Sequence, residues 1–270
     1  MNKIIIAVAP IGPWGQSDDN PLAPNDLACE MQACVEEGAS VVHLHARDKT
    51  GNLTTDLSVF DESVESIKSR CDIILEASTG GLSDLSAVQR GLTLTNPHAE
   101  AGSLNLGSLN FGDEVYRNSV PDVCKWIDEM SIRGVKPSLE VFDTGQVAFA
   151  RHLLSQGLLT PPCNFSFIFN VQWGMPYSAG LLEALKGMLP EESIFGCIFV
   201  ANVDFAQHLE SAGLGASVLR VGFEDSPSFE GGRATSNVDL VRGIRILLEK
   251  AGYQIAGVPE ARGILGTEER

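Results

Sequence analysis

The sequence predicts an α/β protein of the (β/α)8 TIM-barrel class, with a single domain over residues 1–270. Short β-branched runs alternate with longer amphipathic stretches along the whole chain, a pattern typical of a parallel sheet covered by helices. Eight such units in about 250 residues match the size of one closed barrel. The composition agrees, because 270 residues with 44% hydrophobic and 20% charged side chains suit one large core.

The expected strands are short apolar runs rich in β-branched residues. The first contains Ile4-Ile5-Ile6, and the second begins with Ser40-Val41-Val42, whose branched side chains favour an extended backbone. In chain order the eight expected strands cover residues 3–9, 40–45, 72–78, 99–105, 136–142, 164–170, 194–201 and 217–223.

The expected helices are amphipathic stretches between these strands and after the last one. They cover residues 25–37, 57–70, 121–133, 144–156, 178–188, 203–212 and 236–251. Several of them close on glycine, as helix C-termini commonly do, at Gly38, Gly134, Gly157, Gly213 and Gly252. This alternation predicts a parallel sheet with its helices on the outside.

An open, doubly wound sheet is the competing architecture. It is disfavoured because no GxGxxG motif opens a helix after the first strand. Pro10 instead begins a long loop that runs to Pro24. No linker, low-complexity tract or repeat indicates a second domain.

The charge and cysteine content exclude several classes of protein. The net charge of -16, without a cluster of Lys and Arg, argues against nucleic-acid and anionic-membrane partners. The apolar start at residues 4–9 is too short for a signal peptide, and no apolar run reaches the length of a membrane span. Six cysteines without CxxC spacing predict reduced thiols and a cytoplasmic protein.

The segment His43-Leu44-His45-Ala46-Arg47-Asp48 is the most informative feature of the chain. Successive side chains of a strand point to opposite faces, so His43, His45 and Arg47 are expected on one face. Two imidazoles that converge at a strand end form half of a metal site. The alternative is a pair of core histidines bonded to the backbone.

The eighth expected strand leads into a possible third ligand. The segment Arg220-Val221-Gly222-Phe223-Glu224-Asp225 places Arg220, Gly222 and Glu224 on one face, and Glu224 can complete a site with the two histidines. Three ligands with an open position are typical of catalytic zinc, although Fe²⁺ and Mn²⁺ also suit two histidines and a carboxylate. The alternative is a structural ion pair between Arg220 and Glu224.

Other polar residues occupy the ends of the third, fourth and fifth expected strands. Glu76 and Ser78 precede the Gly80-Gly81 pair, whose backbone amides can hold an anion. Ser103 and Asn105 share a face of the fourth strand, and Ser138 and Glu140 share one of the fifth. Active sites of such barrels lie at the C-terminal strand ends, so these side chains are expected to face one cavity.

At these residues the sequence resembles the zinc-dependent β-keto acid cleavage enzymes of the 3-keto-5-aminohexanoate cleavage type, which are (β/α)8 barrels. The matching segments run in family order along nearly the whole chain: residues 43–48, 78–81, 103–105 with 110–111, 134–143, 220–225 and 259–262. The resemblance implies an acyltransferase of the retro-Claisen type. A β-keto acid and acetyl-CoA would give acetoacetate and a new acyl-CoA.

The resemblance also implies roles for individual residues. It makes His43, His45 and Glu224 the Zn²⁺ ligands. It makes Arg220 the residue that assists substrate deprotonation, with Asp225 and Glu140 as electrostatic neighbours. Ser78, Asn105 and the amides of Gly80 and Gly81 would hold the carboxylate and keto groups of the substrate. A homodimer or homotetramer is expected, again by resemblance.

The chain departs from the family pattern where specificity would be set. Relatives that act on amino-substituted keto acids commonly carry an acidic residue in the loop after the first strand, whereas this chain has Ile11-Gly12-Pro13-Trp14. A primary-amine substrate is therefore less expected. Trp14 is expected to line a pocket for an apolar tail, the alternative being a quaternary ammonium held by cation–π attraction.

Two other functions remain open at this point. A metal-dependent hydrolase of the amidohydrolase type also uses an HxH pair in a barrel, but it needs further histidines at later strand ends. His98 precedes a strand here, and His152 and His208 fall in expected helices. A non-catalytic barrel that binds a metabolite or acyl-CoA is the second alternative.

Overall fold

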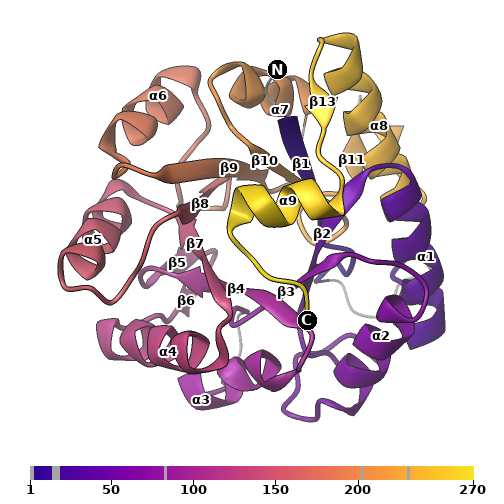
Figure 1. Ribbon diagram of the computed structural model, residues 1–270, viewed down its shortest axis with the longest axis horizontal. Coiled ribbons are helices and arrows are strands. Elements are labelled where there is room, and N and C mark those ends of the chain that lie inside the picture. The colour runs from indigo at the N-terminus through magenta and orange to yellow at the C-terminus, as the bar shows by residue number, and fades with distance from the viewer. Residues whose placement is uncertain (1–2, 14–18, 82–83, 202–203, 230–231) are drawn as a thin grey trace.

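A computed structural model describes residues 3–13, 19–81, 84–201, 204–229 and 232–270 and shows a closed barrel of eight parallel strands (Figure 1). The ring closes because β10 pairs with β1, with Val221 opposite Val8, so the predicted fold class is confirmed and the open sheet is excluded. In order around the ring the strands are β1 (Lys3–Val8), β2 (Ala39–Leu44), β3 (Ile74–Ala77), β4 (Ala99–Asn105), β7 (Lys136–Val141), β8 (Cys163–Phe169), β9 (Ser193–Phe199) and β10 (Val218–Val221).

Helices surround the strands, as the alternation predicts (Figure 1). They are α1 (Pro24–Glu36), α2 (Ser58–Lys68), α4 (Val120–Arg133), α5 (Thr144–Ser155), α6 (Ala179–Met188), α7 (Phe205–Gly213) and α8 (Asn237–Lys250). Each of these helices and barrel strands begins and ends within two residues of its expected position. Their buried faces form one large apolar core between the strands and the helices.

Two of the glycines expected at helix ends show how closely the pattern holds. Gly134 caps α4 in the left-handed conformation, with φ at 64°, as predicted. Gly213 is the last residue of α7, and the left-handed residue is Gly215, with φ at 104°. The turn after α7 therefore lies two residues later than the glycine pattern indicates.

The connection between β3 and β4 contains two short helices that the expected set omits. They are α3 (Ala87–Arg90) and the 3-10 helix η1 (Gly91–Thr95). A reciprocal pair of hydrogen bonds between Ser86 and Gln89 begins α3. Segments this short show no helical periodicity, so the hydrophobic pattern gives no signal for them.

The N-terminal end of the barrel is sealed by the last part of the chain, which the sequence analysis did not assign. The strand β13 (Gln254–Ile255) extends the sheet beside the start of β1. The helix α9 (Val258–Leu265) then crosses the ring in front of the strands (Figure 1). Its apolar residues Val258, Ala261 and Leu265 join a small cluster with inward-facing strand residues such as Ile5.

Buried ion pairs hold α9 in place. Arg262 donates from Nε to Glu100 at 2.7 Å and from Nη1 to Asp72 at 2.7 Å. Lys68 adds a second cation 3.1 Å from the fully buried Glu100 carboxylate. Among the described residues, α9 therefore covers the N-terminal end of the barrel.

The C-terminal end carries longer loops with two small hairpins. One hairpin, β5 (Leu109–Phe111) with β6 (Glu114–Tyr116), lies between β4 and α4, and the other joins β11 (Ser228–Phe229) to β12 (Gly232–Arg233). All six cysteine side chains are free thiols. Among the helices in the described ranges, none has both the length and the apolar character to cross a bilayer.

Candidate active site

A cavity of about 560 Å³ opens at the C-terminal ends of the strands, where active sites of such barrels lie. Most of the residues predicted to form the site line it: His43, His45, Ser78, Gly80, Gly81, Glu140, Arg220, Glu224 and Asp225. Asn105 is buried beside this cavity, where its side chain bonds to two lining residues. Trp14 lies outside the described residues.

The three predicted metal ligands converge on one point. His43 Nε2 lies 3.3 Å from His45 Nε2, Glu224 Oε1 lies 3.3 Å from His45 Nε2, and Glu224 Oε1 lies 3.6 Å from His43 Nε2. A four-coordinate ion with bonds of about 2.1 Å holds its ligand atoms about 3.4 Å apart. The donor atoms therefore already have the spacing of a tetrahedral site with one open position.

Glu224 reaches this point from a turn, and not from the strand that the alternation predicts. Strand β10 ends at Val221, and Gly222 follows with φ at 138°. A Cβ atom on Gly222 would lie 2.2 Å from the carbonyl oxygen of Ala9, so only glycine fits against β1 here. The turn after Gly222 brings both Glu224 and Asp225 to Arg220, which a continuing strand would not do.

A second carboxylate orients the first histidine. His43 donates from Nδ1 to Glu76 Oε1 at 2.7 Å, which leaves Nε2 free to face the other two ligands. Burial alone would raise the pKa of Glu76, but the hydrogen bond and charge of His43, the charge of Arg220 and a hydrogen bond with Ser138 together outweigh it and lower the pKa. Glu76 is thus an ionised acceptor that holds the His43 ring in a ligand-ready tautomer.

The pKa shifts of the other two predicted ligands favour metal binding. Burial lowers the pKa of His45, which favours the neutral imidazole that an ion requires. Burial would raise the pKa of Glu224, but His45, His43 and Arg220 together lower it well below its usual range. Glu224 is therefore a carboxylate at neutral pH.

Arg220 is held in the cavity wall by carboxylates. It donates from Nε to Asp225 Oδ2 at 2.8 Å and from Nη2 to Asp225 Oδ1 at 2.5 Å. Burial would lower its pKa, but Asp225 and Glu224 raise it, so the guanidinium stays charged. Its Nη1 has no hydrogen bond within the described residues and lies 3.7 Å from Glu140 Oε1.

The pKa of Glu140 is raised, whereas that of Glu224 is lowered. Burial raises the pKa of the Glu140 carboxyl, and the nearby carboxylates of Glu76 and Glu224 add to this effect against His43 and Arg220. Asn105 donates from Nδ2 to Glu140 Oε2 at 2.5 Å and to the hydroxyl of Tyr116 at 2.9 Å. Glu140 is therefore a positioned carboxyl that accepts a proton more readily than an ordinary one does.

The predicted anion-binding groups that follow β3 already have partners inside the protein. The Gly80 amide donates to Ser78 Oγ at 3.1 Å, and the Gly81 amide donates to the Tyr116 hydroxyl at 3.1 Å. An incoming carboxylate would compete with these two oxygens for the amide hydrogens. The Ser78 hydroxyl faces the cavity and lies 3.4 Å from the Ser103 hydroxyl.

Arg47 lines the same cavity as His43 and His45, which agrees with the prediction that the three side chains share one face. Its Nη1 donates to the carbonyl oxygen of Gly51 at 2.7 Å.

The histidines that a hydrolase would need lie elsewhere. His208 is buried behind β10 and contacts the Arg220 carbonyl oxygen, while His98 lies 3.3 Å from the exposed Glu65.

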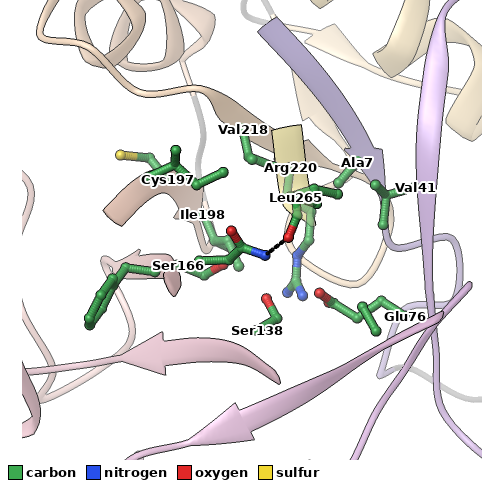
Figure 2. Close-up of a pocket in the computed structure, with 15 residues that line it drawn as sticks. Ala7, Val41, Glu76, Ser138, Ser166, Cys197, Ile198, Val218, Arg220 and Leu265 are labelled. Atoms are coloured by element: carbon green, nitrogen blue, oxygen red, sulfur yellow. Dashed lines mark hydrogen bonds between the residues drawn. The ribbon is translucent and has the colours of Figure 1, made fainter. Parts of the chain in front are cut away.

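A second, enclosed cavity of about 40 Å³ lies deeper in the barrel, between Arg220 and Leu265 of α9 (Figure 2). The Arg220 guanidinium points toward Glu76 and Ser138 in this view. Asn164 donates from Nδ2 to the carbonyl oxygen of Leu265 at 2.9 Å, which ties α9 to β8. This volume has room for only about one or two water molecules, so it is too small for a β-keto acid.

Tyr116 is a site residue that the sequence patterns did not predict, and its hydroxyl joins Asn105 and Gly81 at the cavity wall. Its ring is held by Phe111 and Phe142, and the Arg90 guanidinium lies 5.4 Å from the ring centre. The sequence does carry a turn signal here, because Gly112-Asp113 lies between Leu109-Asn110-Phe111 and Glu114-Val115-Tyr116, and Gly-Asp pairs favour tight hairpin turns. The sequence places Glu76 on the same strand face as Ser78. Its hydrogen bond to His43 depends on how β2 pairs with β3, which the sequence pattern does not show.

The comparisons with known proteins agree with this site. A family model described as beta-keto acid cleavage enzyme matches residues 3–267. The 3-keto-5-aminohexanoate cleavage enzyme of Fusobacterium nucleatum subsp. nucleatum is 34% identical over 275 residues, which cover 100% of each chain. The 3,5-dioxohexanoate:acetyl-CoA acetone transferase of Paraburkholderia graminis is 29% identical over 97% of this chain and 95% of its own.

Among solved structures, the apo structure of ObcA matches with a TM-score of 0.79. Its sequence identity is 20%, and the match covers 93% of this chain and 66% of the ObcA chain, just under two thirds. At this identity the likeness concerns the fold, and it supports the closed barrel.

Proposed function

The chain belongs to the beta-keto acid cleavage enzyme family, and from that premise we propose that it condenses a β-keto acid with acetyl-CoA to give acetoacetate and a new acyl-CoA. One observation carries the proposal. Three metal-ligand atoms, a charged arginine and a carboxyl with a raised pKa all face one open cavity. A structural ion pair alone would need neither the converging histidines nor the open position.

The proposal includes a bound Zn²⁺ held by His43, His45 and Glu224. The spacing of the donor atoms supports a four-coordinate ion, and the open position leaves room for a substrate oxygen. When bound, such an ion polarises a keto or enolate oxygen as a Lewis acid. Six-coordinate Fe²⁺ or Mn²⁺ would place neighbouring ligand atoms closer together, at about 3.1 Å for bonds of about 2.2 Å.

The surrounding side chains take the remaining roles. Glu140 accepts the proton from the carbon between the carboxylate and the keto group, because its raised pKa suits a general base. Arg220 is too basic to take that proton, and its charge stabilises the enolate through the free Nη1. Asp225 holds the guanidinium in place through its two bonds.

The substrate carboxylate is placed near Ser78 and the amides of Gly80 and Gly81. The Ser78 hydroxyl can donate to it directly, while the amides exchange their internal acceptors for the incoming anion. Asn105 acts on Glu140, because both hydrogens of its amide are already donated. Together these contacts orient the dicarbonyl, where proximity contributes most to the rate.

The reaction balances without a redox partner. A bond forms between the acetyl carbonyl carbon and C2 of the keto acid, and the bond between C2 and C3 breaks. The CoA sulfur leaves the acetyl group and ends on C3 as the new thioester, and the proton that Glu140 took from C2 returns to that carbon when the C2–C3 bond breaks. Acetoacetate therefore carries the acetyl group of acetyl-CoA at C3 and C4.

The test follows the acetyl carbons of acetyl-CoA into acetoacetate. Zinc-loaded protein is given acetyl-CoA with ¹³C in both acetyl carbons and a panel of β-keto acids, and acetoacetate is read by NMR. We expect ¹³C at C3 and C4 of acetoacetate, only when both substrates are present. His45→Ala is expected to lower the rate at least about 10³-fold.

The matched control replaces a histidine of the outer helix α5, as His152→Ala, and is expected to keep wild-type activity. Acetate or another hydrolysis product without CoA dependence would contradict the proposal and favour a hydrolase. Tight binding of acyl-CoA without any product would favour a binding protein.

The assembly of the protein as a homodimer or homotetramer stays a prediction. Light scattering of the purified protein at micromolar concentration measures it directly.

A further inference from the structure

One part of the wall of the open cavity is apolar, and it lines the same cavity as the candidate metal ligands. We call it the apolar wall, and its residues are Phe111, Phe142, Ile168, Val171 and Val200. Most of it comes from the ends of β7, β8 and β9, three neighbouring strands of the ring. The metal ligands come from β2 and from the turn after β10.

The alternation of the strands explains this division. Along β8, Asn164, Ser166 and Ile168 point inward in turn, so the polar residues lie deep in the barrel and the apolar one lies at the mouth. The same order holds on β7, where Ser138 and Glu140 precede Phe142. On this side the mouth of the cavity is therefore apolar.

The apolar wall is packed and has no polar side-chain atom. Phe142, Ile168 and Val171 are about 95% buried, and they form one apolar cluster with Tyr116 and Ile198 that is separate from the main core. The Tyr116 ring packs edge-on against Phe142, with 6.4 Å between ring centres. An ionised group placed against this surface would lose its hydration and gain no partner.

In the part of the chain that the structure describes, the charged side chains that line the cavity have partners there, and Arg220 keeps Nη1 without a hydrogen bond. Arg220 is paired with Asp225, and Glu140 accepts from Asn105. Arg47 follows β2, on the opposite side of the ring from β8. Among the described residues, no charged side chain therefore belongs to the apolar wall.

We infer that the apolar wall binds the tail of the β-keto acid, and that this chain takes substrates whose tail beyond the keto carbon is an uncharged alkyl or aryl group. The inference rests on the proposed function and adds the substrate class to it. It separates this chain from the relative named for an amino-substituted hexanoate.

The pantetheine arm of CoA is the other candidate for this surface. It carries two amides, and each amide needs hydrogen-bond partners when it is buried. The side chains of the apolar wall supply none, and three of them are deeply buried. An alkyl tail can pack against this surface without leaving a polar group that lacks a hydrogen-bond partner.

The test compares two acids of nearly equal shape, 5-methyl-3-oxohexanoate and 5-amino-3-oxohexanoate. Calorimetry measures the Kd of each for zinc-loaded protein without acetyl-CoA, so that no turnover is required. We expect the methyl compound to bind at least about 100-fold more tightly. In the same assay 3-oxoadipate, with its anionic tail, is expected to bind at least about 100-fold more weakly than 6-methyl-3-oxoheptanoate.

Two variants test whether the tail binds at the apolar wall. Ile168→Ala is expected to weaken binding of the methyl compound about 10-fold, and Val200→Thr, which keeps the shape and adds a hydroxyl, weakens it by several-fold. Both variants leave the Kd of acetyl-CoA within about twofold. Ile246→Ala, on the outer helix α8, is the matched control and changes neither affinity.

The outcomes are separable. Equal or tighter binding of an ionised tail overturns the inference, and so does an Ile168→Ala variant that weakens acetyl-CoA and spares the keto acid. Labelled acetoacetate with the opposite tail preference overturns the inference and leaves the proposed function intact. The expected ratio of Kd values without labelled acetoacetate supports the inference and contradicts the proposed reaction.

Discussion

Two buried arginines, one at each end of the barrel, show how similar residues serve different purposes. Arg262 lies at the closed N-terminal end and is bonded to Glu100 and Asp72, while Arg220 lies at the open end and is bonded to Asp225 and Glu224. All three guanidinium nitrogens of Arg262 donate hydrogen bonds. Arg220 leaves Nη1 without one within the described residues.

The difference separates stability from function. A saturated buried ion pair fixes one element against another, as Arg262 fixes α9 across the barrel. A buried cation with a free donor beside a cavity has lost hydration that only a ligand or water restores. An unsatisfied donor facing a cavity is thus a more informative sign of a site than burial or charge alone.

The largest expected effect is at the open end. Arg220→Lys keeps the charge but loses the forked contact with Asp225, so we expect kcat/KM to fall about 10³-fold. Steady-state kinetics with a saturating metal supply measures it. A change smaller than about tenfold would show that the free Nη1 does not act on the reacting atoms.

The second effect belongs to the closed end and is on stability. Arg262→Ala leaves Glu100 buried with Lys68 alone, so the free energy of unfolding should fall by about 3 kcal/mol. Urea unfolding measures it, and kcat/KM per folded molecule should stay at the wild-type value. Arg245→Ala, which removes a more exposed ion pair with Glu37, is the control and should cost less than about 1 kcal/mol.

Glu76→Gln tests the residue that orients the first metal ligand. The amide preserves the shape but binds the His43 ring less firmly, so we expect zinc affinity to fall about 10- to 100-fold. Competition with a chromophoric chelator measures this. Unchanged affinity would mean that the strand alone orients the imidazole.

The smallest effect is a pH dependence at the closed end. The Arg262 hydrogen bond lowers the pKa of Asp72, so this carboxylate stabilises the fold above its unfolded pKa of about 4 and loses that contribution as the pH falls through its folded pKa. Asp72 is half exposed, so the contribution is below about 1 kcal/mol. The gap in unfolding free energy between wild type and Asp72→Asn should be constant from pH 6 to 8 and shrink below about pH 4. A difference in unfolding free energy that grows as the pH falls would contradict a stabilising role for the ionised Asp72.

The same comparison shows what the sequence predicts well. Strand and helix periodicity locates the eight strands, and the HxH segment and the strand-eight motif identify the residues that converge in the structure. Local patterns suffice there because the donor atoms sit at strand ends, whose positions the barrel determines.

Contacts between distant segments were not predictable from such patterns. Arg262 meets Glu100 across 162 positions of sequence, and neither residue has a local signal for burial. Tyr116 reaches the cavity from a hairpin of two three-residue strands, too short for periodicity to reveal. The turn that brings Glu224 and Asp225 together depends on a close contact between Gly222 and Ala9.

The central claim is that the open end holds one catalytic metal ion through His43, His45 and Glu224. The most direct measurement titrates Zn²⁺ into chelator-stripped protein and follows the rate of labelled acetoacetate formation. We predict that the rate rises linearly to one equivalent of zinc per chain and then stops, and that His45→Ala shows no rise. Full activity in metal-free protein, or an equal rise in His45→Ala, would contradict the account.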